Sequence, residues 1–225
     1  LRQEKDRSAA REQEALDYYT LWVHQVKIPI SALELLTGQD TEENRAIREE
    51  LFRVRQYTEM ALCYARLGSS GSDYVIREYD LDAILRQALR KFGPQFIRRR
   101  LRLEYAPLNC KILTDEKWFL FVVEQVLSNA LKYTRSGSVT IGHAAPELLS
   151  IRDTGLGIAP EDLPRIFDRG YTGTNGRVDK SSTGIGLYLC RRICQNLGHR
   201  ITALSQVGIG TEIRIDFHRR GLGFD

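Results

Sequence analysis

Apolar residues in the first 67 positions recur at alternating steps of three and four, which is the spacing of a helical seam. The first run is Leu16, Tyr19, Val23, Val26, Ile30 and Leu33, and the second is Ile47, Leu51, Val54, Thr58, Ala61 and Ala65. Between the runs Gly38 interrupts the pattern, and Thr41 with Asn44 is typical of a helix start. The repeat therefore predicts two long helices joined by a short turn.

A single antiparallel hairpin leaves part of these seams open to water, whereas two copies would complete a four-helix bundle. We therefore predict that residues 1–67 form the hairpin of a homodimer. An ordinary coiled-coil spacer would carry the same repeat, so the pattern does not specify a function. The glycine- and serine-rich residues that follow predict a linker over 68–73.

Residues 74–225 mix strand patterns with helix patterns. Strands are expected at 74–79, 101–105, 110–113, 138–143, 148–152, 201–206 and 211–217, and helices at 81–100, 118–132 and 186–197. The irregular order and the adjacent last two strands favour an α/β sandwich with a mixed sheet over a doubly wound parallel fold. The predicted class of the whole chain is α+β, a helical hairpin followed by this sandwich.

Composition excludes several classes of protein. The 33 basic and 29 acidic residues give a net charge of +4, which is no case for nucleic-acid binding. The longest apolar run, from Trp118 to Val123, is far shorter than the roughly 20 residues of a membrane span. Four cysteines without a C-x-x-C spacing suggest reduced thiols in the cytosol. Because the chain begins at Leu1 and its only methionine is Met60, we expect a fragment or a processed chain.

Three glycine pairs carry the first chemical signal. They are Asp153-Thr-Gly-Leu-Gly157, Thr183-Gly-Ile-Gly186 and Gly208-Ile-Gly-Thr211. The second pair directly precedes a predicted helix, whose first N–H groups could receive phosphate. None of them is a P-loop or a dinucleotide-binding fingerprint, and each alone is more often a tight turn.

One helix face adds a second signal. Asn129 and Lys132 are three residues apart, so they share a face of the predicted helix 118–132. An amide oxygen can bind Mg²⁺, and an ammonium group can contact phosphate. A solvated Asn and Lys near a helix end would show the same spacing.

The motifs Asn129-Ala-Leu-Lys-Tyr-Thr134, Asp153-Thr-Gly-Leu-Gly-Ile158, Ile166-Phe167, Thr183-Gly-Ile-Gly-Leu187 and Gly208-x-Gly-Thr211 follow one another in this order. Together they resemble the ATP-binding domain of bacterial sensor histidine kinases, over essentially all of residues 74–225. In the first part, His24-Gln-Val-Lys-Ile-Pro29 resembles the phosphoacceptor box of the same family.

The resemblance implies ATP and Mg²⁺ as cofactors and assigns roles to matching positions. Asn129 would hold Mg²⁺, with Gln125 one turn earlier as a second candidate ligand. Asp153 would accept a hydrogen bond from the adenine amine, a donor that suits a carboxylate. The other expected nucleotide-binding residues are Lys132, Tyr133, Gly155, Gly157, Thr183, Gly184, Gly186 and Thr211. Residues 168–182 would form a mobile lid to which Arg169, Arg177 and Lys180 add positive charge.

For the hairpin, the resemblance implies that His24 attacks the γ-phosphorus through a neutral imidazole nitrogen. His24 follows the seam position Val23, so we expect it at the edge of the buried stripe, reachable from solvent. Lys27 would help to neutralise phosphate. Pro29 removes the hydrogen bond to the carbonyl of Gln25, which predicts a kink beside His24. A lone helical histidine without this context is usually a surface residue.

Three positions depart from the family pattern. Gln25 stands where most members have an acidic residue, and it can orient the imidazole without supplying charge. Ile28 stands where many bifunctional members position a hydrolytic water, so phosphatase activity is not expected. Gln125 stands where the related ATPases, including gyrase, carry a glutamate base. The adjacent Glu124 points about 100° away on a helix.

The resemblance also implies an aspartate of a response-regulator receiver domain as the partner, and a place on the cytoplasmic side of the bacterial membrane. Contact with the membrane would come only through segments absent from this chain. Two other classes stay open at this point. One is a non-catalytic dimerisation scaffold with a degenerate nucleotide pocket, and the other is a related ATPase or serine kinase. The intact nucleotide motifs count against the scaffold.

Overall fold

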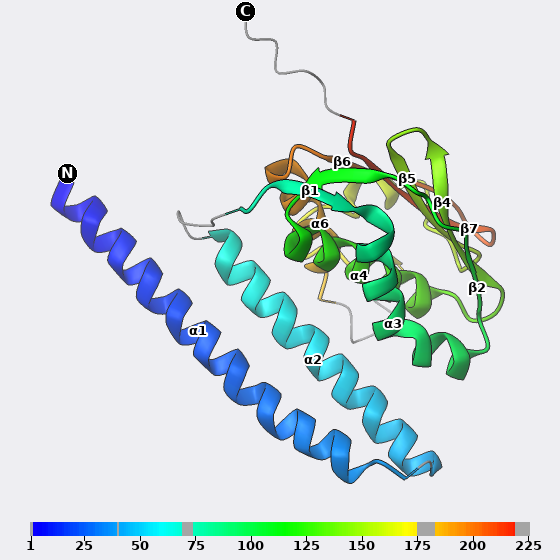
Figure 1. Cartoon of the computed structure of the whole chain (residues 1–225), viewed down its shortest axis with the longest axis horizontal. Coiled ribbons are helices and arrows are strands. Elements are labelled where there is room, and N and C mark those ends of the chain that lie inside the picture. The colour runs from blue at the N-terminus through cyan, green and yellow to red at the C-terminus, as the bar shows by residue number, and fades with distance from the viewer. Residues whose placement is uncertain (1, 40, 69–73, 175–182, 219–225) are drawn as a thin grey trace, which may run out of the picture. The chain divides into compact units, whose positions relative to one another are not determined.

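The computed structural model describes residues 2–39, 41–68, 74–174 and 183–218 of the chain. The chain forms two compact units, residues 1–73 and 74–225, and each is considered by itself (Figure 1). The described part of the first unit holds two helices and no strand, and the second unit combines helices with two sheets.

The first unit is a helical hairpin. Helix α1 runs from Arg2 to Leu36 and helix α2 from Glu42 to Gly68, so the two predicted helices are confirmed. Thr41 caps α2, because its Oγ1 accepts the backbone N–H of Asn44 at 3.2 Å. Helix α1 continues through Pro29 as one element, and the kink beside His24 stays a prediction.

Each seam of the hairpin is buried on one side only. Val23 and Ile30 on α1, and Leu51 and Thr58 on α2, are buried, at seven-residue intervals in both helices. Other seam residues are open, with Leu33 45%, Ile47 44% and Val54 42% exposed. Ion pairs between the helices join Glu34 to Arg55 and Lys27 to Glu59.

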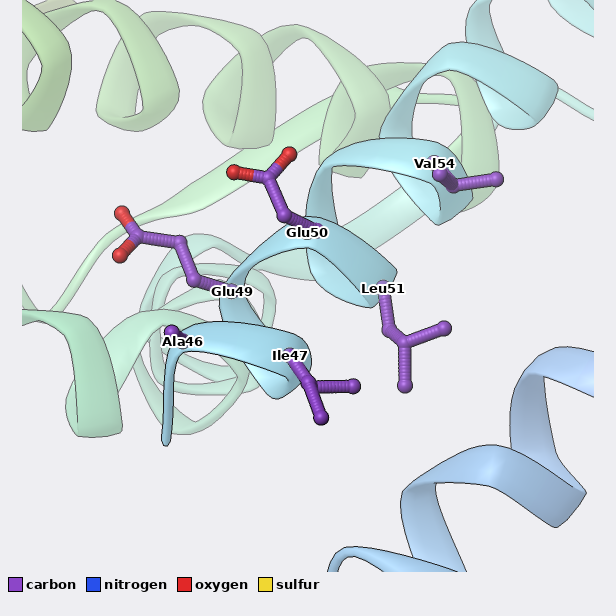
Figure 2. Close-up of a pocket in the computed structure, with 6 residues that line it drawn as sticks. All are labelled: Ala46, Ile47, Glu49, Glu50, Leu51 and Val54. Carbon is purple, nitrogen blue, oxygen red and sulfur yellow. The ribbon is translucent and has the colours of Figure 1, made fainter. Parts of the chain in front are cut away.

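The exposed half of the α2 seam borders a shallow surface pocket. Figure 2 shows Ile47, Leu51 and Val54 projecting from one side of the helix, while Glu49 and Glu50 project from another. Apolar and acidic side chains are therefore sorted onto different sides of α2.

The second unit holds two sheets. In the small one, β1 (Arg77–Asp80) pairs antiparallel with β3 (Lys111–Thr114). The large one has five strands in the order β2-β4-β5-β7-β6. Their bounds are Arg102–Tyr105 for β2, Ser138–Ala145 for β4, Leu148–Asp153 for β5, Arg200–Gln206 for β6 and Gly210–Asp216 for β7. Only the β2–β4 pair is parallel, so the predicted mixed sheet is confirmed.

Three helices pack in a layer on this sheet (Figure 1). They are α3 (Leu81–Arg99), α4 (Glu116–Tyr133) and α6 (Gly186–Asn196), with α4 in contact with both others. A short 3-10 helix, η1, covers Leu163–Arg165. In β5 the buried Leu149 and Ile151 alternate with the more exposed Ser150 and Arg152, so one face of the sheet meets the helices.

The side chain of Asp115 explains two boundaries that differ from the sequence prediction. Asp115 Oδ1 accepts the N–H groups of Lys117 and Trp118, so α4 begins two residues before the apolar run that predicted it. Asp115 Oδ2 accepts the N–H of Val75 at 2.8 Å. The backbone of Val75 is thereby bonded to Asp115, and the strand expected from residue 74 begins only at Arg77.

Two composition-based expectations can be compared with the structure. Over the residues described, no helix has the length and apolar character needed to cross a membrane. Cys63, Cys110, Cys190 and Cys194 are all free thiols.

The buried His199 makes the stability of the second unit depend on pH. The His199 ring lies 3.1 Å from Thr114 Oγ1 and meets Phe119 edge-on, and burial lowers its pKa from 6.5 to about 4 despite the opposing charge of Asp216. The unfolded chain therefore binds a proton at pH values where the folded chain does not. The stability that this group contributes is full above pH 6.5 and is lost as the pH falls toward about 4.

We expect the free energy of unfolding to be about 2 kcal/mol lower at about pH 5 than at about pH 7 through His199 alone. Urea unfolding followed by Trp118 fluorescence, in a Trp22→Phe background, measures it. The variant His199→Gln should lose this part of the pH dependence, whereas His143→Gln, at an exposed position, should keep it. If the free energy of unfolding depended on pH equally in the two variants, the assignment of this pH dependence to His199 would be contradicted.

Candidate active site

A buried carboxyl group at the end of β5 organises one end of the candidate nucleotide site. Asp153 is 9% exposed, and its Oδ1 accepts the backbone N–H groups of Gly155 at 2.8 Å and Thr211 at 3.3 Å. Burial raises the pKa of the carboxyl, and these two N–H groups oppose that rise. Both N–H groups bond to Oδ1, which makes Oδ2 the candidate acceptor for a donor on a ligand.

The glycine loop after Asp153 is pressed against two other elements. A Cβ on Gly155 would lie 2.5 Å from the carbonyl oxygen of Tyr133, and one on Gly157 would lie 2.0 Å from the carbonyl oxygen of Gln206. The N–H of Leu156 bonds to the Tyr133 carbonyl at 3.1 Å. These glycines are therefore required by close packing against α4 and β6, and they are more than the residues of a tight turn.

Thr134 is a site residue that the sequence reasoning missed. It is the C-cap of α4, is 1% exposed, and its hydroxyl favours the charged form of the Asp153 carboxyl. Within the described part of the chain, its Oγ1 has no hydrogen-bond partner of acceptable geometry. A buried hydroxyl without a partner is unfavourable and points to a bond with a ligand or water. Thr134 is the last residue of the Asn129–Thr134 motif, but nothing in the sequence assigned it a role.

Helix α4 carries the predicted phosphate and metal residues. Asn129 and Lys132 are partly exposed, and Lys132 Nζ lies 5.5 Å from the centre of the Tyr133 ring. Gln125 is buried one turn before Asn129. Glu124 pairs with Lys91 of α3 at 2.6 Å, so its carboxylate is held toward α3.

The donor set fits a magnesium ion shared with phosphate better than a site closed by protein ligands. Among the residues described, no cluster of three or more His, Cys, Asp or Glu side chains could hold a metal. The amide oxygens of Asn129 and Gln125 are hard neutral ligands of the kind that Mg²⁺ accepts next to phosphate oxygens.

The N-terminus of α6 forms the other end of the site. The helix begins at Gly186, and no side chain caps it, so its first N–H groups can bind an anion. Gly184 has a φ of +66°, and a Cβ there would lie 2.4 Å from the carbonyl carbon of Gly170. The Thr183–Gly186 loop therefore lies directly against residues 168–174. The rest of the predicted lid, with Arg177 and Lys180, lies outside the described residues.

The hairpin presents the predicted phosphoacceptor on its surface. His24 is exposed and follows the buried Val23, as the seam predicted. Gln25 is exposed beside it. Lys27 lies 3.7 Å from Glu59 of α2, so its charge is partly balanced in the hairpin. The roles of these three residues stay predictions.

Comparison with known proteins agrees with this geometry. Residues 114–221 match the family model described as "Histidine kinase-, DNA gyrase B-, and HSP90-like ATPase". That stretch includes Asn129, Thr134, Asp153 and the α6 N-terminus. The second unit is therefore an ATPase domain of this class.

Relatives extend the match into the hairpin. The chain is 34% identical over 210 residues to the sensor histidine kinase YxdK of Bacillus subtilis, covering 89% of this chain and 64% of the relative. It is 31% identical over 215 residues to the sensor protein BceS of Halalkalibacterium halodurans, covering 92% of this chain and again 64% of the relative. This chain thus spans a little under two thirds of these relatives.

Among solved structures, the crystal structure of full-length ShkA in complex with AMPPNP matches with a TM-score of 0.64 and 25% identity, over 88% of this chain and 45% of that one. The chain belongs to the two-component sensor histidine kinases, of which it represents the transmitter region.

The packing around Gly155 predicts that Gly155→Ala weakens nucleotide binding. The added methyl group would lie 2.8 Å from Asp153 Oδ1 and 2.9 Å from Thr134 Oγ1, so it would displace both polar groups of the pocket. We expect binding of a fluorescent ATP analogue to weaken by at least about tenfold. Gly142→Ala is the matched control, because a Cβ on Gly142 in β4 meets no atom within 4 Å. Similar titrations for the two variants would contradict this account of the pocket.

Proposed function

We propose that this chain is an ATP-dependent histidine kinase that phosphorylates its own His24 and passes the phosphoryl group to an aspartate of a receiver domain. The observation that carries the proposal is the buried pair of Asp153 and Thr134. One carboxylate oxygen of Asp153 is held by two backbone N–H groups, and the Thr134 hydroxyl beside it is without a partner in the described chain.

This pair suits the edge of adenine. The second carboxylate oxygen of Asp153 accepts a hydrogen bond from an exocyclic amine, and the Thr134 hydroxyl donates to the neighbouring ring nitrogen. Guanine offers a carbonyl and an N–H at the equivalent positions, so it would place an acceptor against the carboxylate. The pocket therefore favours ATP over GTP.

The other end of the site would hold the phosphates. The uncapped N–H groups of α6 and the ammonium of Lys132 bind phosphate oxygens. Asn129 and Gln125 would hold Mg²⁺, which when bound neutralises phosphate charge. Thr183 and Gly184 shape the loop that leads into α6.

Transfer itself requires a protein nucleophile. The lone pair of a neutral His24 imidazole nitrogen attacks the γ-phosphorus, and the bond from that phosphorus to the bridging oxygen breaks, so ADP leaves. Gln25 orients the ring by accepting from its N–H. Gln125 does not titrate and is a poor base for water, which favours transfer to His24 over hydrolysis.

The relatives support the wider setting of this proposal. YxdK is named a sensor histidine kinase and BceS a sensor protein. We propose that this chain, like the transmitters of such kinases, works on the cytoplasmic side of a bacterial membrane. The apolar Ile28, 60% exposed, cannot hold a hydrolytic water, so we propose no phosphatase activity on the receiver.

Incubation with radiolabelled ATP and Mg²⁺ tests the proposal. We expect acid-labile phosphate on the chain, which His24→Ala abolishes and His143→Ala retains, because His143 is equally exposed but lies on β4. Acid-stable phosphoprotein or free phosphate would favour a related serine kinase or ATPase. Nucleotide binding without transfer would favour a non-catalytic scaffold. A chase with purified receiver domains then measures the second transfer.

The half-buried seams support a homodimer. The exposed Leu33, Ile47 and Val54 repeat along the two helices and would form the centre of a four-helix bundle with a second hairpin. A second hairpin would bury these side chains and so remove from water the apolar surface that a single hairpin leaves exposed.

Sedimentation equilibrium should therefore find a dimer. Ile47→Glu would bury a carboxylate in that centre, and we expect the dissociation constant to rise by at least about tenfold. Gln39→Glu, which adds the same charge in the exposed turn between the helices, should leave it unchanged. A monomer at every concentration, or a dimer unaffected by Ile47→Glu, would rule out this interface.

A further inference from the structure

A second buried carboxyl group lies between the two ends of the nucleotide site. Asp162 is 8% exposed and holds the N-cap position of η1, yet its side chain makes no hydrogen bond to that helix. It accepts instead from the hydroxyl of Tyr171, from the N–H of Thr174 at 2.9 Å and from Thr174 Oγ1 at 3.0 Å. A residue type that normally caps its own helix is thus bonded to a segment about ten residues further on.

The segment that donates these hydrogen bonds packs closely around the Asp162 carboxylate. A Cβ on Gly173, which has a φ of +59°, would lie 3.1 Å from Asp162 Oδ2. The guanidinium of Arg165 stacks on the Tyr171 ring at 4.2 Å, and Arg165 Nε lies 3.7 Å from the carboxylate of Asp168. Tyr171 is therefore fixed at its hydroxyl by Asp162 and at its ring by Arg165.

The same segment touches the phosphate loop. The N–H of Gly170 bonds to the carbonyl oxygen of Gly184 at 3.0 Å. A Cβ on Gly184 would lie 2.7 Å from the backbone nitrogen of Tyr171. Any shift of Tyr171 would therefore move the backbone that lies against Gly184, two residues before α6 begins.

On its other side Asp162 is joined to the adenine end of the site. Its N–H bonds to the carbonyl of Ala159, and the N–H of Ile158 bonds to Ser205 Oγ at 2.8 Å. Ser205 Oγ lies 2.8 Å from Thr211 Oγ1, and the N–H of Thr211 bonds to Asp153. An almost continuous series of hydrogen bonds thus leads from the base-binding carboxylate to Asp162.

We propose that Asp162 is a positioning residue that sets the phosphate loop at the correct distance from the adenine pocket. This inference rests on the proposed function, because it assigns Asp162 to the nucleotide site of the kinase. A carboxylate is suited to the task because it only accepts hydrogen bonds and can take all three donors at once. An amide of the same shape would turn an N–H₂ donor toward one of them.

The test compares Asp162→Asn with Glu161→Gln in the full chain. The control removes the neighbouring charge at an exposed position. We expect Asp162→Asn to raise the KM for ATP, and the dissociation constant of a fluorescent ATP analogue, by about tenfold, because hydrogen bonds to charged groups are the strong ones. The kcat at saturating ATP should fall less than threefold or so, since His24 and the reacting phosphate are untouched.

Tyr171→Phe keeps the ring on Arg165 and removes only the hydroxyl. It should raise the same constants in the same direction. Because the two side chains act through one bond, the double variant Asp162→Asn/Tyr171→Phe should change them by less than the product of the single effects. This cycle keeps the inference testable if Asp162→Asn folds poorly.

The outcomes distinguish failure of the kinase proposal from failure of the positioning role of Asp162. Absence of acid-labile phosphate on both the wild type and Glu161→Gln would reject the kinase proposal, and the binding constants would still report on Asp162. Asp162→Asn and Tyr171→Phe with wild-type binding and KM would overturn the positioning role. A lowered melting temperature with unchanged KM and nucleotide binding would also overturn it, since that is the result of a purely structural carboxylate.

Discussion

The second unit is organised around the hydrogen bonds that hold the Asp153 carboxyl group. Asp153 is the last residue of β5, and it stands opposite Thr211 of β7 and Val139 of β4 in the sheet. Its bonds to the N–H groups of Gly155 and Thr211 tie the glycine loop to the start of β7. Since the loop also bonds to the end of α4 through Tyr133, one carboxyl group links helix, loop and sheet. Burial raises the pKa of this carboxyl, and its hydrogen bonds favour the charged form that an amine donor requires.

The two ends of the site use different kinds of interaction. At the adenine end, buried side chains of Asp153 and Thr134 offer hydrogen bonds in fixed directions. At the phosphate end, the backbone N–H groups of α6 offer an electrostatic attraction that tolerates movement of the phosphates. In the proposed kinase, Asp162 would connect the two ends through Tyr171 and Thr174, so the spacing between base and phosphate would follow from the fold rather than from the ligand.

The features that separate this chain from related ATPases lie on α4. Gln125 replaces a titrating base, and Glu124 is held by Lys91 on α3. In the proposed kinase, water activation would therefore be disfavoured in the pocket. On the hairpin, the half-buried seams leave His24 at the surface next to the buried Val23, where it is accessible to solvent.

The sequence by itself determined most of the helices and strands and the candidate residues of the site. The seams predicted both hairpin helices, and the glycine pairs with Asn129 and Asp153 indicated a candidate nucleotide site, because these signals depend on neighbours within a few positions. Tertiary structure decided what depends on distant partners. Asp115 shortens β1 by bonding to Val75, forty residues away. The Thr134 hydroxyl lies beside the Asp153 carboxyl only because the loop after β5 packs against the end of α4. Asp162 looks like an ordinary helix cap in the sequence, and only the folded loop brings Tyr171 and Thr174 to its carboxylate.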